Sequence, residues 1–403
     1  MGLWRTLRPY LVVALLNASE GMITMLVPPY LDSQGFAPTA VGLLVSAYGV
    51  ACLASRLPAG ALYRGDRARA LLASALVAVA IMSLVYPLAT AHWSLLLVRA
   101  MHGLAYGLAT TINLALFIDL LPPTAARHHA MGYFMAALGC GFTLGQAIGG
   151  FAADWYGYGW AFALAAAPPL LALGLVDAPP AAASGPTPRR TGMGGLRGGL
   201  RTGLRALAAP GIAPIALLGF FLAFFLNLSS TFMPLFALAI GLGLSEIGLL
   251  RSAHSVCNSI TRPFSGSFID RIGHTRIGAG SLAFNAVALT LLPTMTTMLS
   301  LSLLMIAIGL VRGIAMVANT VSLAADVDET RVSRGLATGI YYASRDLGGI
   351  AGPVAGGFVA GIAGIDAMFR VVPVLGLAAY VVGLALSARL RPRQATVPAG
   401  SVP

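Results

Sequence analysis

Residues 247–276 read IGLLRSAHSVCNSITRPFSGSFIDRIGHTR, an apolar segment long enough to span a membrane that nevertheless carries an arginine and a histidine. Residues 41–65 read VGLLVSAYGVACLASRLPAGALYRG and show the same pattern earlier in the chain. Both segments contain Gly-Leu-Leu, continue through Ser-Ala, and reach an arginine that is followed four residues later by a glycine. This repetition indicates that two parts of the chain share one architecture.

The composition places both segments in a membrane protein. The chain has 403 residues, of which 58% are hydrophobic and 9% charged, unlike any soluble globular domain. Apolar blocks of about 20 residues, each able to cross a hydrocarbon core about 30 Å thick as a helix, recur along it. No segment alternates as the strands of a β-barrel would. Twelve transmembrane helices are predicted, at 9–31, 39–62, 68–89, 93–121, 131–153, 160–176, 212–238, 245–269, 276–295, 298–325, 335–360 and 367–388.

The repeat keeps its register over four of these spans. Residues 42, 56 and 103 match residues 248, 262 and 309 at a constant offset of 206, and Gly149-Gly150 matches Gly356-Gly357 at an offset of 207. Two pseudo-symmetric six-helix bundles explain this better than chance apolar similarity. The predicted organisation is an N-terminal bundle at 1–177, a basic linker at 178–211, a C-terminal bundle at 212–390 and a tail at 391–403. Arginines spaced every four residues in the linker indicate either a surface-lying helix or a flexible segment.

The charges predict the topology. All 25 lysine-or-arginine positions are arginine, and they concentrate in alternate connections and at both termini. The positive-inside bias therefore predicts a multi-pass protein of the inner membrane with both termini cytoplasmic. The net charge of +12 follows from this topology and indicates no nucleic-acid partner. The three cysteines lie inside predicted spans without the spacing of metal ligands, so neither a metal site nor a cofactor is expected.

Five motifs resemble those of the major facilitator superfamily, in the family's order and over the whole chain. They are GALYRGDRAR at 60–69, RAMHGLAYG at 99–107, GFTLGQAIGG at 141–150, GSFIDRIGHTR at 266–276 and GGIAGPVAGG at 348–357. The first has an arginine, at position 64, where the family has aspartate, and the third has a glutamine, at position 146, where the family has proline. The resemblance implies twelve helices in two bundles, with rearrangement along the glycine faces of the fifth and eleventh spans.

Buried charge is costly in a bilayer and therefore marks candidate functional positions. The resemblance implies that spans one, four, seven and ten line a central cavity, with spans two, five, eight and eleven beside them, and the buried charges fall in these spans. Arg345 and Asp346 could also neutralise one another, and each histidine could be a satisfied interior residue. The expected proton-coupling residues are Glu20 and Asp346. The expected substrate-binding residues are Arg99, His102, Gln146, Asn227, Arg251, His254, Arg312 and Arg345.

A second group is expected to gate the cytoplasmic side. The resemblance implies that the loop aspartate of the first half helps to close this side, and here Arg64 replaces it. We therefore expect a lock of reversed sign between Arg64 and an acidic cluster at 326–329, although Arg64 could instead serve the positive-inside bias alone. Arg56 and Arg262, near helix ends, could also snorkel or cap. The expected gating residues are Arg56, Arg64, Arg262, Asp270, Arg271, Asp326, Asp328 and Glu329.

These patterns favour a transporter over other classes of protein. No Gly-Lys-Ser phosphate loop, His-Glu-x-x-His motif or nucleophile triad supports an enzyme. Duplicated halves with glycine faces favour alternating access over a channel, and a scaffold or sensor would not need so many buried charges. We expect a monomeric secondary transporter for a small anionic or zwitterionic solute, working as a proton-coupled antiporter in efflux. The alternative is proton-coupled uptake of an organic anion or a metal chelate.

Overall fold

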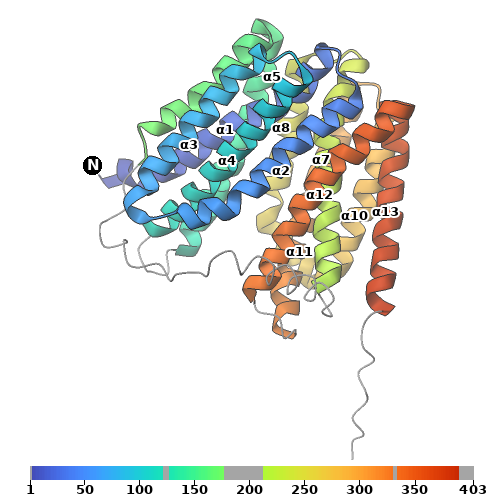
Figure 1. Cartoon of the computed structure of the whole chain (residues 1–403). Helices are drawn as coiled ribbons and strands as arrows, with labels where there is room; N and C mark the ends of the chain where they lie inside the picture. Colours follow the sequence, from blue (N-terminus) through green and yellow to red (C-terminus); the bar gives the residue numbers. More distant parts are fainter. Residues whose placement is uncertain (1, 121–126, 177–211, 330–333, 390–403) are drawn as a thin grey trace, which may run out of the picture.

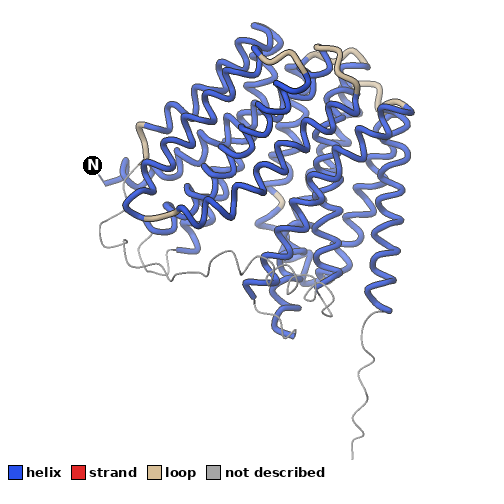
Figure 2. Tube along the Cα trace, in the orientation of Figure 1, coloured by secondary structure: helices blue, strands red, loops and turns tan. Residues whose placement is uncertain are grey.

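The computed structural model of the chain describes residues 2–120, 127–176, 212–329 and 334–389, and all regular structure in these ranges is helical (Figures 1 and 2). The first half contains α1 (Gly2–Ser33), α2 (Pro38–Leu62), α3 (Gly65–Val85), η1 (Tyr86–Leu88), α4 (His92–Leu120) and α5 (Arg127–Leu173). The second half contains α7 (Ile212–Ala239), α8 (Leu244–Ile260), η3 (Arg262–Phe264), α9 (Ser265–Ile272), α10 (His274–Leu291), η4 (Leu292–Thr294), α11 (Met298–Glu329), α12 (Arg334–Ala363) and α13 (Ile365–Arg389).

The described helices account for twelve membrane crossings. Ten are long and apolar enough to span a bilayer. One of these, within α5, is a 45-residue apolar stretch that contains two spans, because Gly157 adopts a φ of 80° and bends the helix between them. The short α8 continues through η3 into α9, with a turn at Pro263, and this segment forms the eighth crossing. The predicted fold class, an all-α membrane protein of two six-helix bundles, is confirmed.

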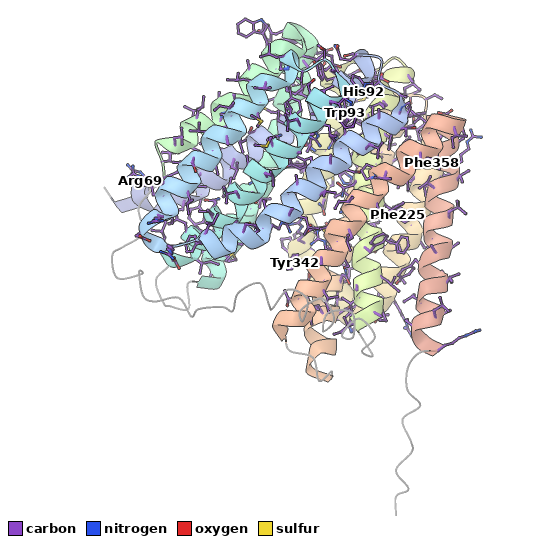
Figure 3. The ribbon with its side chains drawn as sticks, viewed as in Figure 1. Arg69, His92, Trp93, Phe225, Tyr342 and Phe358 are labelled. Atoms are coloured by element: carbon purple, nitrogen blue, oxygen red, sulfur yellow. The ribbon has the colours of Figure 1, made fainter. Side chains whose placement is uncertain are left out.

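Large apolar side chains cover the outside of the molecule as well as its interior. Trp93 is 80% exposed and Phe358 is 60% exposed, whereas Phe225 is 2% exposed and packs inside the second half (Figure 3). A soluble protein does not present so many exposed aromatic and aliphatic groups. The outer surface is therefore the face that lies against lipid, and the chain is a multi-pass membrane protein.

The glycine faces of the fifth and eleventh spans hold each half together internally. A Cβ added at Gly141 or Gly145 would lie 2.0 Å from a backbone oxygen of α1, that of Ala14 for Gly141. A Cβ added at Gly348 would lie 2.0 Å from the backbone oxygen of Phe220 in α7. Helices in such contact are fixed at backbone distance. These faces therefore pack α5 on α1 and α12 on α7 within the halves, and the rearrangement expected along them stays a prediction.

The contact between the halves depends on a different set of glycines. A Cβ on Gly42 of α2 would lie 2.1 Å from the oxygen of Pro353 and 3.1 Å from the Cα of Gly357, both in α12. A Cβ on Gly150 of α5 would lie 2.9 Å from the Cα of Gly248 in α8. Gly42 and Gly248 are repeat counterparts, and so are Gly150 and Gly357. The two contacts are therefore equivalent under the pseudo-two-fold relation of the halves.

These contacts lie toward one end of the molecule. The two bundles are close together where α1 ends and α2 begins, here named the contact end, and diverge toward the opposite end, where α7 begins (Figure 1). Side chains support the same two helix pairs: the Ser46 hydroxyl donates to the oxygen of Ile350 at 2.8 Å, and the Ser252 hydroxyl donates to that of Thr143 at 2.9 Å. The opposite end is named the linker end.

Enlarging Gly150 should force the contact end apart. Overpacking typically costs about 1–3 kcal/mol, so Gly150→Val should raise the labelling rate of a single cysteine at position 39 roughly tenfold. The measurement uses a background without the three native cysteines. Gly280→Val is the matched control, because nothing lies within 4 Å of a Cβ at that position. Equal labelling rates in the two variants would contradict the prediction.

Candidate functional site

The first half contains a buried acid–imidazole pair. Glu20 of α1 and His102 of α4 are 4% and 0% exposed, and 3.9 Å separates Glu20 Oε2 from His102 Nε2. The Tyr86 hydroxyl lies 3.1 Å from His102 Nδ1, which orients the ring. Within the described residues, Glu20 Oε2 and His102 Nε2 have no hydrogen-bond partner. Buried polar atoms are rarely left in this state, so the pair is a candidate for binding or exchanging a proton.

Arg99 lies beside this pair but faces the protein itself. Its Nε donates to the oxygen of Leu44 at 3.0 Å, its Nη2 donates to that of Val45 at 3.3 Å, and its Nη1 donates to the Tyr86 hydroxyl at 3.1 Å. The guanidinium also lies 4.5 Å from the ring centre of Tyr48. Arg99 thus joins α4 to α2, and its expected role in substrate binding stays a prediction.

Arg251 and Gln146 connect the halves. Arg251 of α8 donates through Nη1 to the oxygens of Ser230, at 2.6 Å, and of Thr24 in the first half, at 3.2 Å. In the amide orientation that satisfies both ends of Gln146, its oxygen accepts from Arg251 Nη2 at 3.2 Å and from Nε at 3.3 Å. The residue that departs from the family motif therefore provides a contact that proline could not make.

The remaining second-half candidates occupy α7, α8, α11 and α12. Arg312 is 3% exposed and donates through Nη1 to the oxygen of Leu222 at 3.0 Å. Arg345 is half-buried and lies 5.6 Å from the ring centre of Tyr341. These two arginines lie near enough to repel one another electrostatically.

The histidine and the asparagine of this half each use part of their hydrogen-bonding capacity on a backbone oxygen. His254 Nδ1 lies 3.2 Å from the oxygen of Met305, while its Nε2 has no hydrogen-bond partner within the described residues. Asn227 donates to the oxygen of Ala223, one turn earlier in α7, at 3.0 Å. Such a bond satisfies the helix locally. His254 therefore offers a free ring nitrogen, whereas Asn227 offers its oxygen.

Asp346 forms an ion pair with the other half of the protein. Its Oδ2 accepts from Arg56 Nη1 at 2.7 Å, and the two side chains are 24% and 43% exposed. The sequence left open a mutual neutralisation of Asp346 by its neighbour Arg345. The structure instead gives Asp346 a partner in α2, so that Arg345 is not the residue that binds it. This pair also gives Arg56 a definite contact across the halves.

The other gating candidates do not form a lock among the described side chains. Arg64, Asp270 and Arg271 are exposed and make no ion pair with another residue whose side chain the structure describes. Arg262 is half-buried, and its Nη2 lies 3.8 Å from Met316 Sδ. The acidic side chains proposed to face Arg64 lie outside the described part, so this lock stays a prediction. They are Asp326, Asp328 and Glu329.

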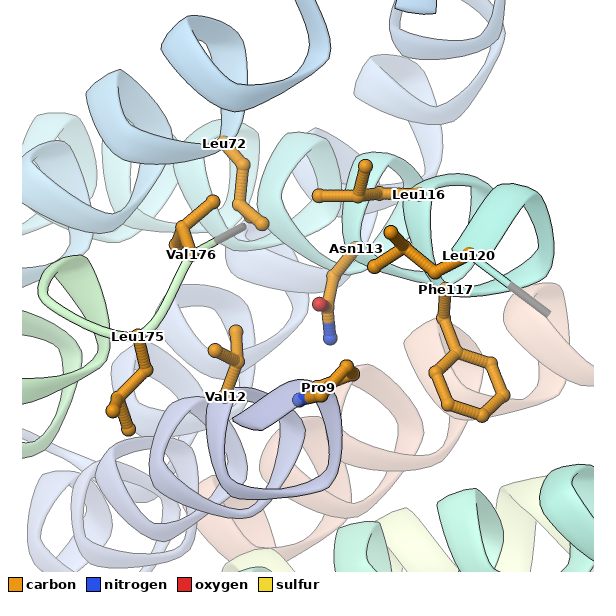
Figure 4. A pocket seen from close by; sticks show the side chains of 9 residues that line it. All are labelled: Pro9, Val12, Leu72, Asn113, Leu116, Phe117, Leu120, Leu175 and Val176. Carbon is orange, nitrogen blue, oxygen red and sulfur yellow. The ribbon is translucent and has the colours of Figure 1, made fainter. Parts of the chain in front are cut away.

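A small pocket in the first half lies apart from these groups. Its lining comes from α1, α3, α4 and the residues after α5, and the Asn113 amide points into it (Figure 4). None of its lining residues is charged, so it offers nothing to bind an ionised solute. The lining residues are Pro9, Val12, Leu72, Asn113, Leu116, Phe117, Leu120, Leu175 and Val176.

Sequence reasoning missed the tyrosines around the acid–imidazole pair. Tyr86 bonds both His102 and Arg99, and the Tyr106 hydroxyl donates to Asn17 Oδ1 at 2.9 Å. Tyr106 follows His102 by four residues, so both lie on one face of α4. That spacing could have predicted one of the tyrosines. The position of Tyr86, in η1, could not be derived from helical periodicity.

The fold and these buried polar groups define a membrane transporter built from two related halves. The chain belongs to the major facilitator superfamily, whose family model, described as Major Facilitator Superfamily, matches residues 10–245 and 215–402. An uncharacterized MFS-type transporter of Methanocaldococcus jannaschii is 22% identical over 369 residues, which cover 87% of this chain and 89% of that protein.

Two solved structures are similar over nearly the whole chain. A bacterial homolog of the human lysosomal transporter Spinster, in an inward-facing and unoccupied conformation, has a TM-score of 0.72 at 16% identity and covers 97% of this chain and 96% of its own. A mutant of the nucleoside transporter NupG has a TM-score of 0.77 at 16% identity and covers 96% of this chain and 100% of its own. At this identity the likeness shows the shared fold.

Breaking the ion pair between Arg56 and Asp346 should loosen the halves at this point. Because both groups are partly exposed, the pair contributes about 1 kcal/mol or less, or up to roughly fivefold in the equilibrium between conformations. Arg56→Asp should therefore raise the labelling rate of a cysteine at position 49, which lies two turns before Arg56 on the side of α2 that meets α12, by this factor. The charge-reversed double variant, Arg56→Asp with Asp346→Arg, should restore the original rate. Failure of the double variant to differ from the single one would contradict a pairwise contact.

Proposed function

We propose that the protein is a secondary active transporter that moves a small organic solute across the membrane and couples this movement to protons through Glu20. The observation that carries the proposal is the buried pair of Glu20 and His102, whose facing atoms have no other hydrogen-bond partner among the described residues. Intramembrane acids of this kind normally serve a transport path or a proton relay. The tyrosines around the pair can orient the imidazole in either protonation state.

The helix arrangement supports alternating access. The halves meet through paired glycines near the contact end and diverge toward the linker end. A second state would exchange these ends, with each half moving as a unit because its own helices are held at backbone distance. Arginine placement argues that the linker end is cytoplasmic, in the inner membrane, and the arrangement described would then be the cytoplasm-facing one. One chain contains both halves, so a monomer suffices.

Export is the direction that we propose. It rests on the fourth-span arginine, Arg99, and on the two antiporter-like glycine motifs of the fifth and eleventh spans. In an antiporter, the proton and the solute bind the protein in alternate half-cycles of transport. An acid buried within one half of the protein allows this. Solute and proton would then move in opposite directions. The sign of proton flux on solute addition tests this directly.

Glu20→Gln should abolish coupling while leaving solute exchange. The amide keeps the size of the side chain but cannot bind or release a proton, so solute-driven proton flux should fall at least tenfold. Purified protein is placed in lipid vesicles with a trapped pH-sensitive dye, and small organic acids, amines and neutral nucleosides are added as candidate solutes. Exchange of labelled for unlabelled solute is measured in the same vesicles.

Asp366→Asn is the matched control, because Asp366 is an exposed acid at the start of α13, at the contact end. Its proton flux should equal that of the unchanged protein. Normal flux in Glu20→Gln, with loss in Asp346→Asn, would transfer the coupling role to Asp346. Solute transport that responds to no pH gradient in the unchanged protein would reject proton coupling altogether.

A further inference from the structure

Three arginines of the second half lie on elements that pack together, because α11, which carries Arg312, contacts both α12, which carries Arg345, and η3, which carries Arg262. Arg312 of α11, at 3% exposed, is acted on electrostatically by Arg345 of α12 and by Arg262 of η3, and Arg345 acts on Arg262 in turn. No carboxylate is among the charges that act on Arg312 or Arg262 within the described residues. Like charges brought together in a weakly solvated interior are unfavourable unless an anion joins them. This arrangement therefore needs a partner of negative charge.

Among the described acids, Asp346 interacts electrostatically with Arg345, but no acid does so with Arg312 or Arg262. Asp346 adjoins the cluster, but its Oδ2 is already bonded to Arg56 at 2.7 Å. Arg262 is the repeat counterpart of Arg56, at the offset of 206, and the counterpart of Asp346, at the offset of 207, is Gly139. One of the two equivalent interfaces thus carries an ion pair, while the other has a glycine at the position that corresponds to the acid.

Polar atoms near the cluster are also left without partners. Among the described residues, the Nε atoms of Arg312 and Arg262 and both amide atoms of Asn319 are buried and have no hydrogen-bond partner. Asn319 is 1% exposed and lies two turns after Arg312 on the same face of α11. Such atoms normally bind something. Arg99 and Arg251 differ, since the Nε atom of Arg99 donates to the oxygen of Leu44 and that of Arg251 donates to Gln146 in its satisfied amide orientation.

Gly219 of α7, which has no side chain, lies beside these atoms. A Cβ added at Gly219 of α7 would lie 3.2 Å from Arg345 Cγ, 3.4 Å from Asn319 Nδ2 and 3.4 Å from Ser344 Oγ. The stem of Arg345 and the polar ends of Asn319 and Ser344 therefore meet beside the α7 backbone, which brings these three residues close together. A guanidinium, an amide and a hydroxyl together provide the donors that a carboxylate or phosphate accepts.

We infer that the cluster of Arg312, Arg345, Arg262 and Asn319 binds the anionic group, a carboxylate or a phosphate, of the solute that the protein transports. The inference deepens the proposed function and rests on it for the statement that the bound solute is carried. The planar guanidinium suits both groups, because it can donate two parallel hydrogen bonds. The acid that couples protons lies in the other half, so proton and anion have separate sites.

Ligand-dependent stabilisation tests binding directly. The purified full-length chain in neutral detergent is heated with inorganic phosphate, succinate, glucose or tetraphenylphosphonium, at constant ionic strength. A ligand that binds the folded state raises the unfolding temperature in proportion to the logarithm of its concentration. Phosphate or succinate should raise it, while glucose and the lipophilic cation should not. Stabilisation by the cation, with no response to either anion, would overturn the inference.

Variants assign the response to the cluster. Arg312→Gln should raise the anion concentration needed for half-maximal stabilisation at least tenfold, and Arg345→Lys should raise it less, since charge is kept while the planar fork is lost. Arg370→Gln is the matched control, because Arg370 is an exposed arginine of α13 outside the cluster. An effect of Arg370→Gln equal to that of Arg312→Gln would overturn the assignment.

Asn319→Asp keeps the test decisive if the arginine variants fold poorly. The new carboxylate would occupy the cluster in place of the ligand. The variant should therefore unfold at a higher temperature than the unchanged protein without any anion, and it should no longer respond to phosphate or succinate. A purely structural role for Asn319 predicts the opposite, since a buried charge without a cationic partner destabilises the fold. A lower unfolding temperature with an unchanged anion response would overturn the inference.

A final experiment distinguishes binding of a soluble anion from binding of a lipid headgroup. It also distinguishes failure of this inference from failure of the proposed function. The heating experiment is repeated with phosphatidylglycerol and with phosphatidylcholine in the micelles. Stabilisation by phosphatidylglycerol alone would overturn the assignment to a transported solute. Anion binding without solute-driven proton flux would retain this site and reject proton coupling. Flux that depends on Glu20 but is driven by amines alone would retain coupling and overturn the anion site.

Discussion

The closest approach between the two halves is made by backbone atoms, and the rest of the architecture depends on that contact. Gly42 meets Gly357, and Gly150 meets Gly248, with no side chain between the two glycines of either pair. A contact between two glycines can separate and form again without any change of side-chain rotamer. Dispersion forces between the helices hold them together. A few hydrogen bonds, such as that of the Ser46 hydroxyl to the backbone of α12, fix their relative orientation.

Within each half the same residue type has the opposite effect. Gly141, Gly145 and Gly149 place α5 against α1 over about two turns, and Gly348 and Gly352 place α12 against α7 over about one turn. These contacts are accompanied by buried apolar packing, which would be lost if the helices parted. With this packing each half can move as a unit, while between the halves glycine forms an interface that Ser46 and the pair of Arg56 and Asp346 extend along α2 and α12. Function in this fold needs both properties at once.

The repeat allowed the sequence to predict the twofold equivalence of these contacts, but not which glycines would make them. Gly149 packs on α1, whereas Gly150, the next residue, packs on α8 of the other half. One residue turns about 100° around a helix, and glycine spacing alone cannot say which neighbour a face meets. Long-range partners were equally hidden: Asp346 finds Arg56 across 290 residues. The burial of Glu20 and Arg312 was predicted, because their position in apolar spans decides it.

The bonds of Arg99 have a mechanical consequence. Its guanidinium holds the backbone oxygens of Leu44 and Val45, within one turn of Gly42, where α2 touches the other half. Charged hydrogen bonds of this kind contribute about 1.5–3 kcal/mol each, so α2 cannot tilt away from α4 at little cost. The two helices therefore move as one rigid unit. The acid–imidazole pair lies on its inner side, and the interface between the halves lies at its edge. A movement that begins beside Glu20 would then displace Gly42 as well, because α2 and α4 do not bend relative to each other.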